Sequence, residues 1–170
     1  MKQFARVAVM FVVGLIVATP ALAGVADSPL PVLEAGKKTY HLYSVPGVLS
    51  WIGMNLATYF ACTSTDTATM QVGVEVFDSN AFLSNDAAAT SFSLVAGQSV
   101  LFGTHQSFNE LFDVSLNLSA GDISGYTGSA RILATSRKLI CTAFLADHSA
   151  SPSPSMVYLT VIKKTTQKGE

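Results

Sequence analysis

The residues best suited to chemistry in this sequence are three histidines, His41, His105 and His148. Histidine binds metal ions and transfers protons near neutral pH, but a metal pair on one element needs a second ligand a few residues away. None of the three has such a neighbour. His105 is followed by Glu110 and Asp113, yet isolated titratable residues are weak indicators of an active site. We therefore predict no metal site and no cofactor.

The sequence contains no recognisable nucleophile motif. A serine nucleophile commonly lies on a sharp elbow with the pattern G-x-S-x-G, and the nearest stretch, GYTGS at 125–129, does not fit it. Separated carboxylates can still meet in space, as they do in glycoside hydrolases. We predict that the protein is not an enzyme, and a hydrolase with carboxylates gathered from distant strands ranks last among the functions considered.

Polar side chains in two predicted loops are suited to hydrogen bonding with a small ligand. Amide, carboxylate and imidazole groups supply both donors and acceptors. The candidate ligand-binding residues are Asn80, Asn85 and Asp86 in the loop at 78–90, and His148 in the loop at 147–155.

Cys62 and Cys141 are the only two cysteines. An even number of cysteines in an exported chain is typical of a structural disulfide, which predicts a Cys62–Cys141 bond. Both residues fall on the predicted inward faces of their strands, so we expect the bond to cross between two sheets. Such a bond adds roughly 4 kcal/mol of stability in the chain-entropy model. Two buried free thiols are the alternative.

The first 23 residues predict a signal peptide. Lys2 and Arg6 precede the apolar run 7–18, and the small-x-small pattern that ends at Ala23 is typical of a cleavage site. A membrane anchor needs about 20 apolar residues, so a retained anchor is the less favoured alternative. We expect an exported protein, periplasmic or extracellular, with no membrane span after cleavage.

The mature chain has a mild negative charge. Loss of Lys2 and Arg6 leaves 8 of the 10 Lys+Arg against 11 Asp+Glu, which gives a net charge of −3. This balance argues against binding nucleic acid or anionic lipid through a general basic surface. We expect three adjacent basic pairs to be solvated strand ends: Lys37-Lys38, Arg137-Lys138 and Lys163-Lys164.

Arg131 is a less ordinary basic residue because it lies in the middle of a predicted strand. It alternates with Ala130 and Ile132, so its side chain should point away from the core. We expect an exposed arginine whose aliphatic part covers its neighbours. The alternative is a pocket or a partner that faces this side of the sheet.

The elements that must position these residues are short strands. From Thr39 onward, apolar and polar residues alternate with a period of two, and turn residues interrupt the pattern about every ten residues. We expect Pro46-Gly47 to end the first strand, and 91–94 and 99–104 to form a hairpin. Residues 48–56 fit either a helical turn or a loop packed on the sheet. The predicted strands are 39–44, 57–63, 70–77, 91–94, 99–104, 111–118, 129–135, 138–146 and 156–163.

Seven to nine short strands without interleaved helices predict an all-β protein, an antiparallel two-sheet sandwich of immunoglobulin-like architecture. The tryptophan that immunoglobulin domains place between their two cysteines is missing, because Trp51 precedes both cysteines. The predicted layout is a signal peptide at 1–23, an extended N-terminal arm at 24–38, the β-sandwich domain at 39–164 and a polar tail at 165–170.

Four strand-like runs carry a resemblance to known proteins. They are TYFACT at 58–63, VGVEVF at 72–77, LFGT at 101–104 and SARILAT at 129–135. The stretch from Leu56 to Lys163 resembles small exported bacterial β-sandwich proteins of unassigned function. The resemblance implies the sandwich fold and brings no functional residue with it.

These observations predict a protein that binds a partner through its surface and does not catalyse a reaction. We expect a structural or interaction module of the cell envelope or extracellular space, since exposed strand edges are natural pairing sites. Its partner would be another copy of itself or another envelope protein. The alternative is a small-ligand or carbohydrate-binding protein of the periplasm.

Overall fold

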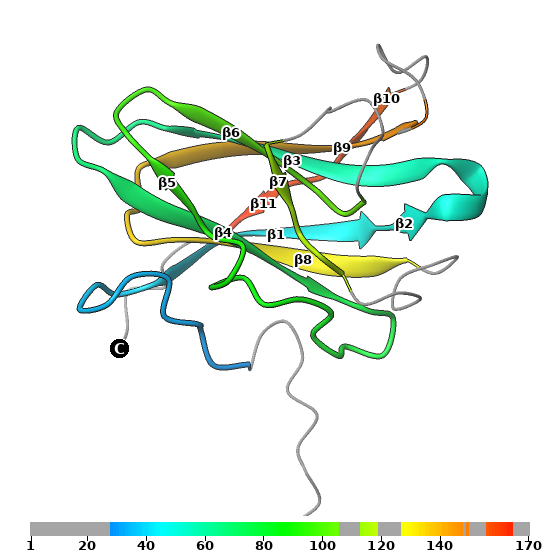
Figure 1. The fold of residues 1–170 in the computed structure, drawn as a ribbon, viewed down its shortest axis with the longest axis horizontal. Coiled ribbons are helices and arrows are strands. Elements are labelled where there is room, and N and C mark those ends of the chain that lie inside the picture. The colour runs from blue at the N-terminus through cyan, green and yellow to red at the C-terminus, as the bar shows by residue number, and fades with distance from the viewer. Residues whose placement is uncertain (1–27, 106–112, 119–126, 148, 150–155, 165–170) are drawn as a thin grey trace, which may run out of the picture.

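Two β-sheets packed face to face form an open sandwich (Figure 1). The computed structural model describes residues 28–105, 113–118, 127–147, 149 and 156–164. Within these ranges the chain forms eleven strands and a single 3-10 turn, Ile52–Met54. The prediction of an all-β, two-sheet protein is confirmed, although the strands outnumber the seven to nine expected.

The five-stranded sheet, called sheet A below, has the order β11-β1-β8-β4-β5. Its strands are β1 (Tyr40–Val48), β4 (Met70–Phe77), β5 (Phe92–Leu94), β8 (Gly128–Ala134) and β11 (Ile162–Lys163). The six-stranded sheet, sheet B, has the order β10-β9-β3-β6-β7, with β2 paired to β3. Its strands are β2 (Ser50–Trp51), β3 (Leu56–Ser64), β6 (Ser99–Gly103), β7 (Val114–Ser115), β9 (Leu139–Asp147) and β10 (Met156–Leu159). All pairs are antiparallel except β6–β7.

The first strand is longer than predicted because Pro46-Gly47 does not end it. Gly47 adopts a φ of 78°, which glycine tolerates without steric cost, and the register between β1 and β8 shifts between Pro46 and Val48. A β-bulge therefore bends the strand and lets the pairing continue to Val48. The ambiguous stretch that follows forms β2 and the 3-10 turn.

The predicted hairpin at 91–104 is wrong. Strand β5 pairs with β4 in sheet A, whereas β6 pairs with β3 in sheet B, so residues 95–98 carry the chain from one sheet to the other. The predicted single strand at 156–163 is likewise divided between β10 in sheet B and β11 in sheet A. Alternation identifies which residues face inward, but it does not distinguish a hairpin from a corner between sheets.

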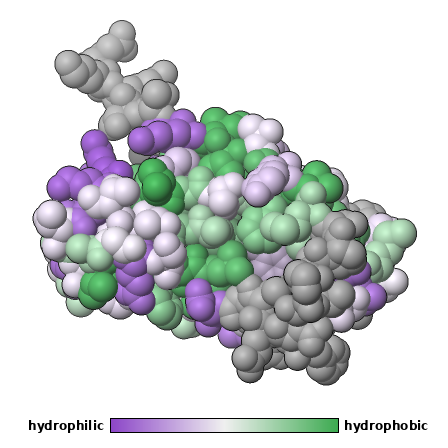
Figure 2. Space-filling view, turned by 90° about the horizontal axis from the view of Figure 1, so that it is seen from above, coloured by the Kyte–Doolittle hydropathy of each residue, from purple (hydrophilic) through white to green (hydrophobic). Residues whose placement is uncertain are grey.

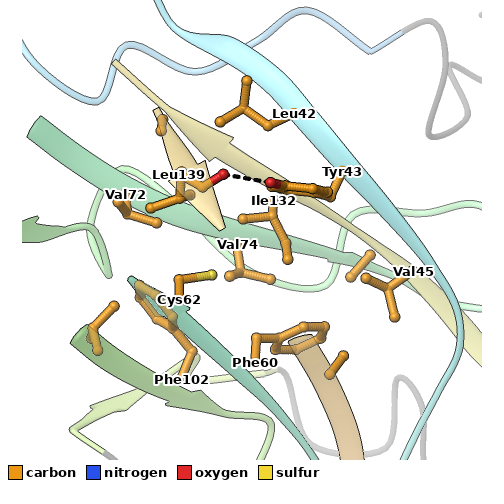
Figure 3. Packing of buried hydrophobic residues seen from close by; sticks show 14 of the residues in the cluster. Leu42, Tyr43, Val45, Phe60, Cys62, Val72, Val74, Phe102, Ile132 and Leu139 are labelled. Atoms are coloured by element: carbon orange, nitrogen blue, oxygen red, sulfur yellow. Dashed lines mark hydrogen bonds between the residues drawn. The ribbon is translucent and has the colours of Figure 1, made fainter. Parts of the chain in front are cut away.

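The core lies between the two sheets and is built from the predicted inward faces (Figure 3). From β4 it takes Met70, Val72, Val74 and Val76, as the alternation predicts. The Tyr43 hydroxyl donates a hydrogen bond to the Leu139 carbonyl oxygen, which joins β1 of sheet A to β9 of sheet B (Figure 3). Burial raises the pKa of Tyr43 above its ordinary value, so the hydroxyl stays protonated and keeps this bond.

The predicted disulfide is confirmed, but its place differs from the prediction. Cys62 on β3 and Cys141 on β9 are direct cross-strand partners with Cα atoms 4.2 Å apart, so the bond lies within sheet B. Both residues do face the core. The bond therefore reinforces one long strand pair instead of joining the two sheets, and it indicates an oxidising compartment.

Candidate functional site

The predicted ligand-binding residue Asn85 has a structural role. Its side-chain Oδ1 accepts a hydrogen bond from the Val76 N–H at 2.8 Å, and its Nδ2 donates one to the Val74 carbonyl at 2.8 Å. Strand β5 pairs only with residues 70–72 of β4. The amide of Asn85 thus replaces a strand partner for the following part of β4, and its two hydrogen-bonding groups are already used.

The other predicted ligand residues also make local contacts or lie beyond the described chain. The Asp86 carboxylate accepts hydrogen bonds from the N–H groups of Ala88 and Ala89, and Asn80 is an exposed turn residue. Residue 148 lies outside the described residues, so the prediction for His148 stays untested. The loop at 78–90 thus uses two of its three candidates to build its own turns and to hold β4.

Sequence reasoning missed the most unusual polar pair in the described chain. Arg131 on β8 and Glu75 on β4 are cross-strand partners, and the arginine Nε donates to the glutamate Oε2. The two side chains are only 1% and 3% exposed. The expectation that Arg131 is exposed is wrong, because the outward face of sheet A is itself covered.

The cover over Arg131 comes from the N-terminal segment. The two terminal nitrogens of Arg131 donate to the carbonyl oxygens of Ser28 and Pro29 at 3.0 and 3.1 Å. Its guanidinium carbon also lies 5.3 Å from the centre of the Phe77 ring. These contacts satisfy a buried cation and hold the segment that starts at Ser28 against sheet A, so the Arg131–Glu75 pair has a structural role.

Strand β10 presents an exposed edge of sheet B, and it is the best candidate interaction site. Among the described residues it pairs only with β9, and it ends the strand order of the sheet (Figure 1). The side chains of Met156, Val157 and Tyr158 are 50%, 60% and 71% exposed. The strand has no charged residue and no proline, which are two of the devices that usually protect an edge from pairing.

A row of aromatic rings fixes β10 in place. Tyr59 on β3, Phe144 on β9 and Tyr158 on β10 are successive cross-strand partners. The first two rings stack with centres 5.5 Å apart, and the second and third meet edge to face at 6.3 Å. Such pairs contribute about 0.5–1.5 kcal/mol each beyond their buried area, and the second pair links the edge strand β10 to β9.

The outer face of sheet B next to this edge is also apolar. Figure 2 shows hydrophobic residues gathered over the middle of the face formed by β3, β6 and β9. Ile140 on β9 is 58% exposed, and Phe144, further along the same strand, and Leu101 on β6 are partly buried.

Neither a metal centre nor a membrane-spanning helix occurs in the part of the chain that the structure describes. No three His, Cys, Asp or Glu side chains within it are grouped to hold a metal ion. None of its helices has the length and apolar character needed to cross a membrane.

Comparison with known proteins identifies no relative. No family model, curated protein sequence or solved structure matches the chain. Only the geometry of this molecule therefore points to a function.

Proposed function

We propose that this protein is an exported, non-enzymatic interaction module of immunoglobulin-like architecture. Its β10 edge pairs with the same strand of a second copy. The observation that carries the proposal is the uncharged, exposed edge strand at the end of sheet B. Its setting is the periplasm or the extracellular space, in agreement with the disulfide within the same sheet.

The chemistry of the edge favours a second copy as the occupant. An edge strand directs half of its N–H and C=O groups away from its neighbour, and another extended strand satisfies them. Two identical edges pair antiparallel about a twofold axis, the commonest symmetry of soluble oligomers. Because Met156, Val157 and Tyr158 carry no charge, two copies of the strand meet without electrostatic repulsion.

The test is the oligomeric state of the mature protein, measured by size-exclusion chromatography with light scattering over a range of concentrations. We expect a concentration-dependent dimer, and we expect Val157→Lys to weaken it at least about tenfold. In a symmetric pair the two new lysines lie on adjacent strands of the joined sheet, so their like charges oppose the pairing.

Val95→Lys is the matched control. Val95 is 53% exposed, close to the 60% of Val157, but it lies in the connection between β5 and β6. This variant should dimerise as the unmodified protein does. A monomer at every concentration, or equal weakening by both variants, contradicts self-pairing. Recovery of a different envelope protein on β10 would instead identify a heterologous partner.

A second candidate function is small-ligand binding, and a cavity of about 450 Å³ favours it. This volume is in the range of small-molecule sites. The cavity lies at the start of β1 and is lined by none of Asn80, Asn85 and Asp86. Thermal unfolding of the mature protein with a panel of small ligands tests this function, since a bound ligand raises the midpoint by mass action.

A further inference from the structure

Three chain segments far apart in sequence meet at one end of sheet A. Tyr40 at the start of β1 pairs with Ala134 at the end of β8, so the turn after β8 lies beside the beginning of β1. On the other side of β1, Tyr43 pairs with Lys163 at the end of β11, and the Lys164 N–H donates to the Leu42 carbonyl at 2.8 Å. Antiparallel pairing thus places three strand termini together.

The cavity at this meeting point has a strongly basic lining. One residue from the approach to β1, one from the turn after β8 and two from the end of β11 contribute positive charges: Lys38, Arg137, Lys163 and Lys164. None of the described residues that line the cavity is acidic. Each basic pair that the sequence suggests to be a solvated strand end supplies at least one of these residues.

The four cations have no ion pair with a described carboxylate. The described salt bridges of the neighbouring lysines go elsewhere, from Lys37 to Glu34 and from Lys138 to Asp66. Lys38 and Arg137 instead lie over the Tyr40 ring, at 5.6 and 4.7 Å from its centre. Since the whole mature chain is acidic, this concentration of positive charge without a described carboxylate partner is a local feature of the fold.

The remaining walls are suited to an organic group. Leu30 and Leu42 are apolar, and Tyr40, Thr39 and His41 add an aromatic face and hydrogen-bonding groups. The His41 Nε2 lies 3.1 Å from the Tyr43 carbonyl oxygen and 3.0 Å from the Ser44 Oγ. Burial, and then the charges of Lys164 and Arg131, lower the pKa of His41 to about 4. At neutral pH the positive charge therefore comes from the lysines and the arginine.

We propose that this cavity is a binding site for a small molecule that carries a phosphate monoester. A phosphate monoester bears nearly two negative charges at pH 7 and three acceptor oxygens, which suits cations that approach from three segments. The volume exceeds that of a bare phosphate and leaves room for a sugar or a lipid headgroup against Leu30, Leu42 and Tyr40. This inference rests on the second candidate function and names its ligand class.

The test is calorimetric titration of the mature protein with glucose 6-phosphate, inorganic phosphate and glucose, and sedimentation with phosphatidylcholine vesicles with or without phosphatidic acid. We expect glucose 6-phosphate to bind and glucose not to bind. Arg137→Gln and Lys38→Gln should each weaken binding about tenfold, through loss of one charge-assisted hydrogen bond. Bound phosphate should also raise the pKa of His41, measured by NMR, because it offsets the charge of Lys164.

The chain offers matched controls one residue away. Lys138→Gln and Lys37→Gln remove the same charge outside the cavity lining, and they should change the affinity by less than about twofold. The proposal would be overturned if a control variant lost as much affinity as the neighbouring cavity variant. It would also be overturned if none of the phosphate probes bound. Binding of glucose as tight as glucose 6-phosphate would overturn the phosphate ligand while leaving small-ligand binding intact. Binding only to phosphatidic acid vesicles would identify a lipid headgroup as the source of the phosphate.

Discussion

Arg131 shows how a single residue ties the chain terminus to the sheet. Alternation with Ala130 and Ile132 correctly predicts that the Arg131 side chain points away from the core. Whether that side chain is buried depends on whether another segment covers this face of sheet A. The segment at 28–33 supplies two carbonyl oxygens to the guanidinium, and Glu75 supplies the counter-charge. No local pattern in the sequence connects residue 28 with residue 131, so only the folded chain reveals this contact.

Removing Arg131 should therefore destabilise the protein strongly. Arg131→Ala leaves the Glu75 carboxylate buried without its partner, which typically costs about 3–5 kcal/mol. Lys138→Ala is the control, because Lys138 is exposed and its ion pair with Asp66 is screened by solvent, so its loss should change stability far less. Urea denaturation of both variants measures the difference. Comparable, small losses would show that the buried pair does not hold the fold together.

His41 predicts a specific pH dependence of stability. Its pKa is about 4 in the folded protein and 6.5 in the unfolded chain, so the unfolded state takes up a proton first as the pH falls. The stabilisation is complete above pH 6.5 and is lost as the pH falls toward 4, by at most about 1.4 kcal/mol per pH unit. We expect the free energy of unfolding, measured by denaturation at several pH values between 4 and 7, to fall less steeply with decreasing pH in His41→Gln than in the unmodified protein. An unchanged slope would refute this assignment.

At the scale of elements, the inward faces are predictable and the connections are not. The alternation along 70–77 identifies β4 with the correct bounds, and Cys62 and Cys141 face the core as expected. The same periodicity describes a hairpin and a corner equally well, so the change of sheet between β5 and β6 leaves no local signal. The position of the disulfide within one sheet follows from strand order, which the sequence pattern does not contain.

The disulfide should stabilise the folded protein substantially. Cys62 and Cys141 close a loop with a sequence separation of 79, for which the chain-entropy model gives roughly 4 kcal/mol. The double variant Cys62→Ala/Cys141→Ala should keep the sandwich, since β3 and β9 remain paired along their whole length, but it should unfold at a lower urea concentration. Unmodified protein in a reducing agent should show the same shift. An unchanged midpoint in both experiments would contradict the expected stabilisation.

Gly73 on β4 lies directly beneath the two segments that cover sheet A, near Leu33 and Ala87. A Cβ atom at this position would lie 3.0 Å from both the Ala87 carbonyl oxygen and the Leu33 Cδ2. Gly73→Ala should therefore lower stability by about 1–3 kcal/mol through overpacking, measured by thermal or urea denaturation. A neutral substitution would mean that the N-terminal segment and residues near 87 do not lie on this sheet as described.

At the scale of the whole molecule, the two sheets have different outer faces. The outer face of sheet A holds the buried Arg131–Glu75 pair and is covered by the chain near Leu33 and Ala87. The outer face of sheet B exposes Ile140 and ends at β10. The all-β class is readable from composition and periodicity. The β10 edge, the segments that cover sheet A and the basic cavity all depend on strand order, so they can be recognised only in the folded structure.

The most direct test of the account is amide hydrogen exchange at Met156–Leu159 in the mature protein, measured by NMR at low and high protein concentration. Self-pairing predicts that the β10 amides directed away from β9 gain protection as the concentration rises, and that Val157→Lys abolishes the gain. Fast exchange of these amides at every concentration would contradict the proposal that β10 is where two copies meet.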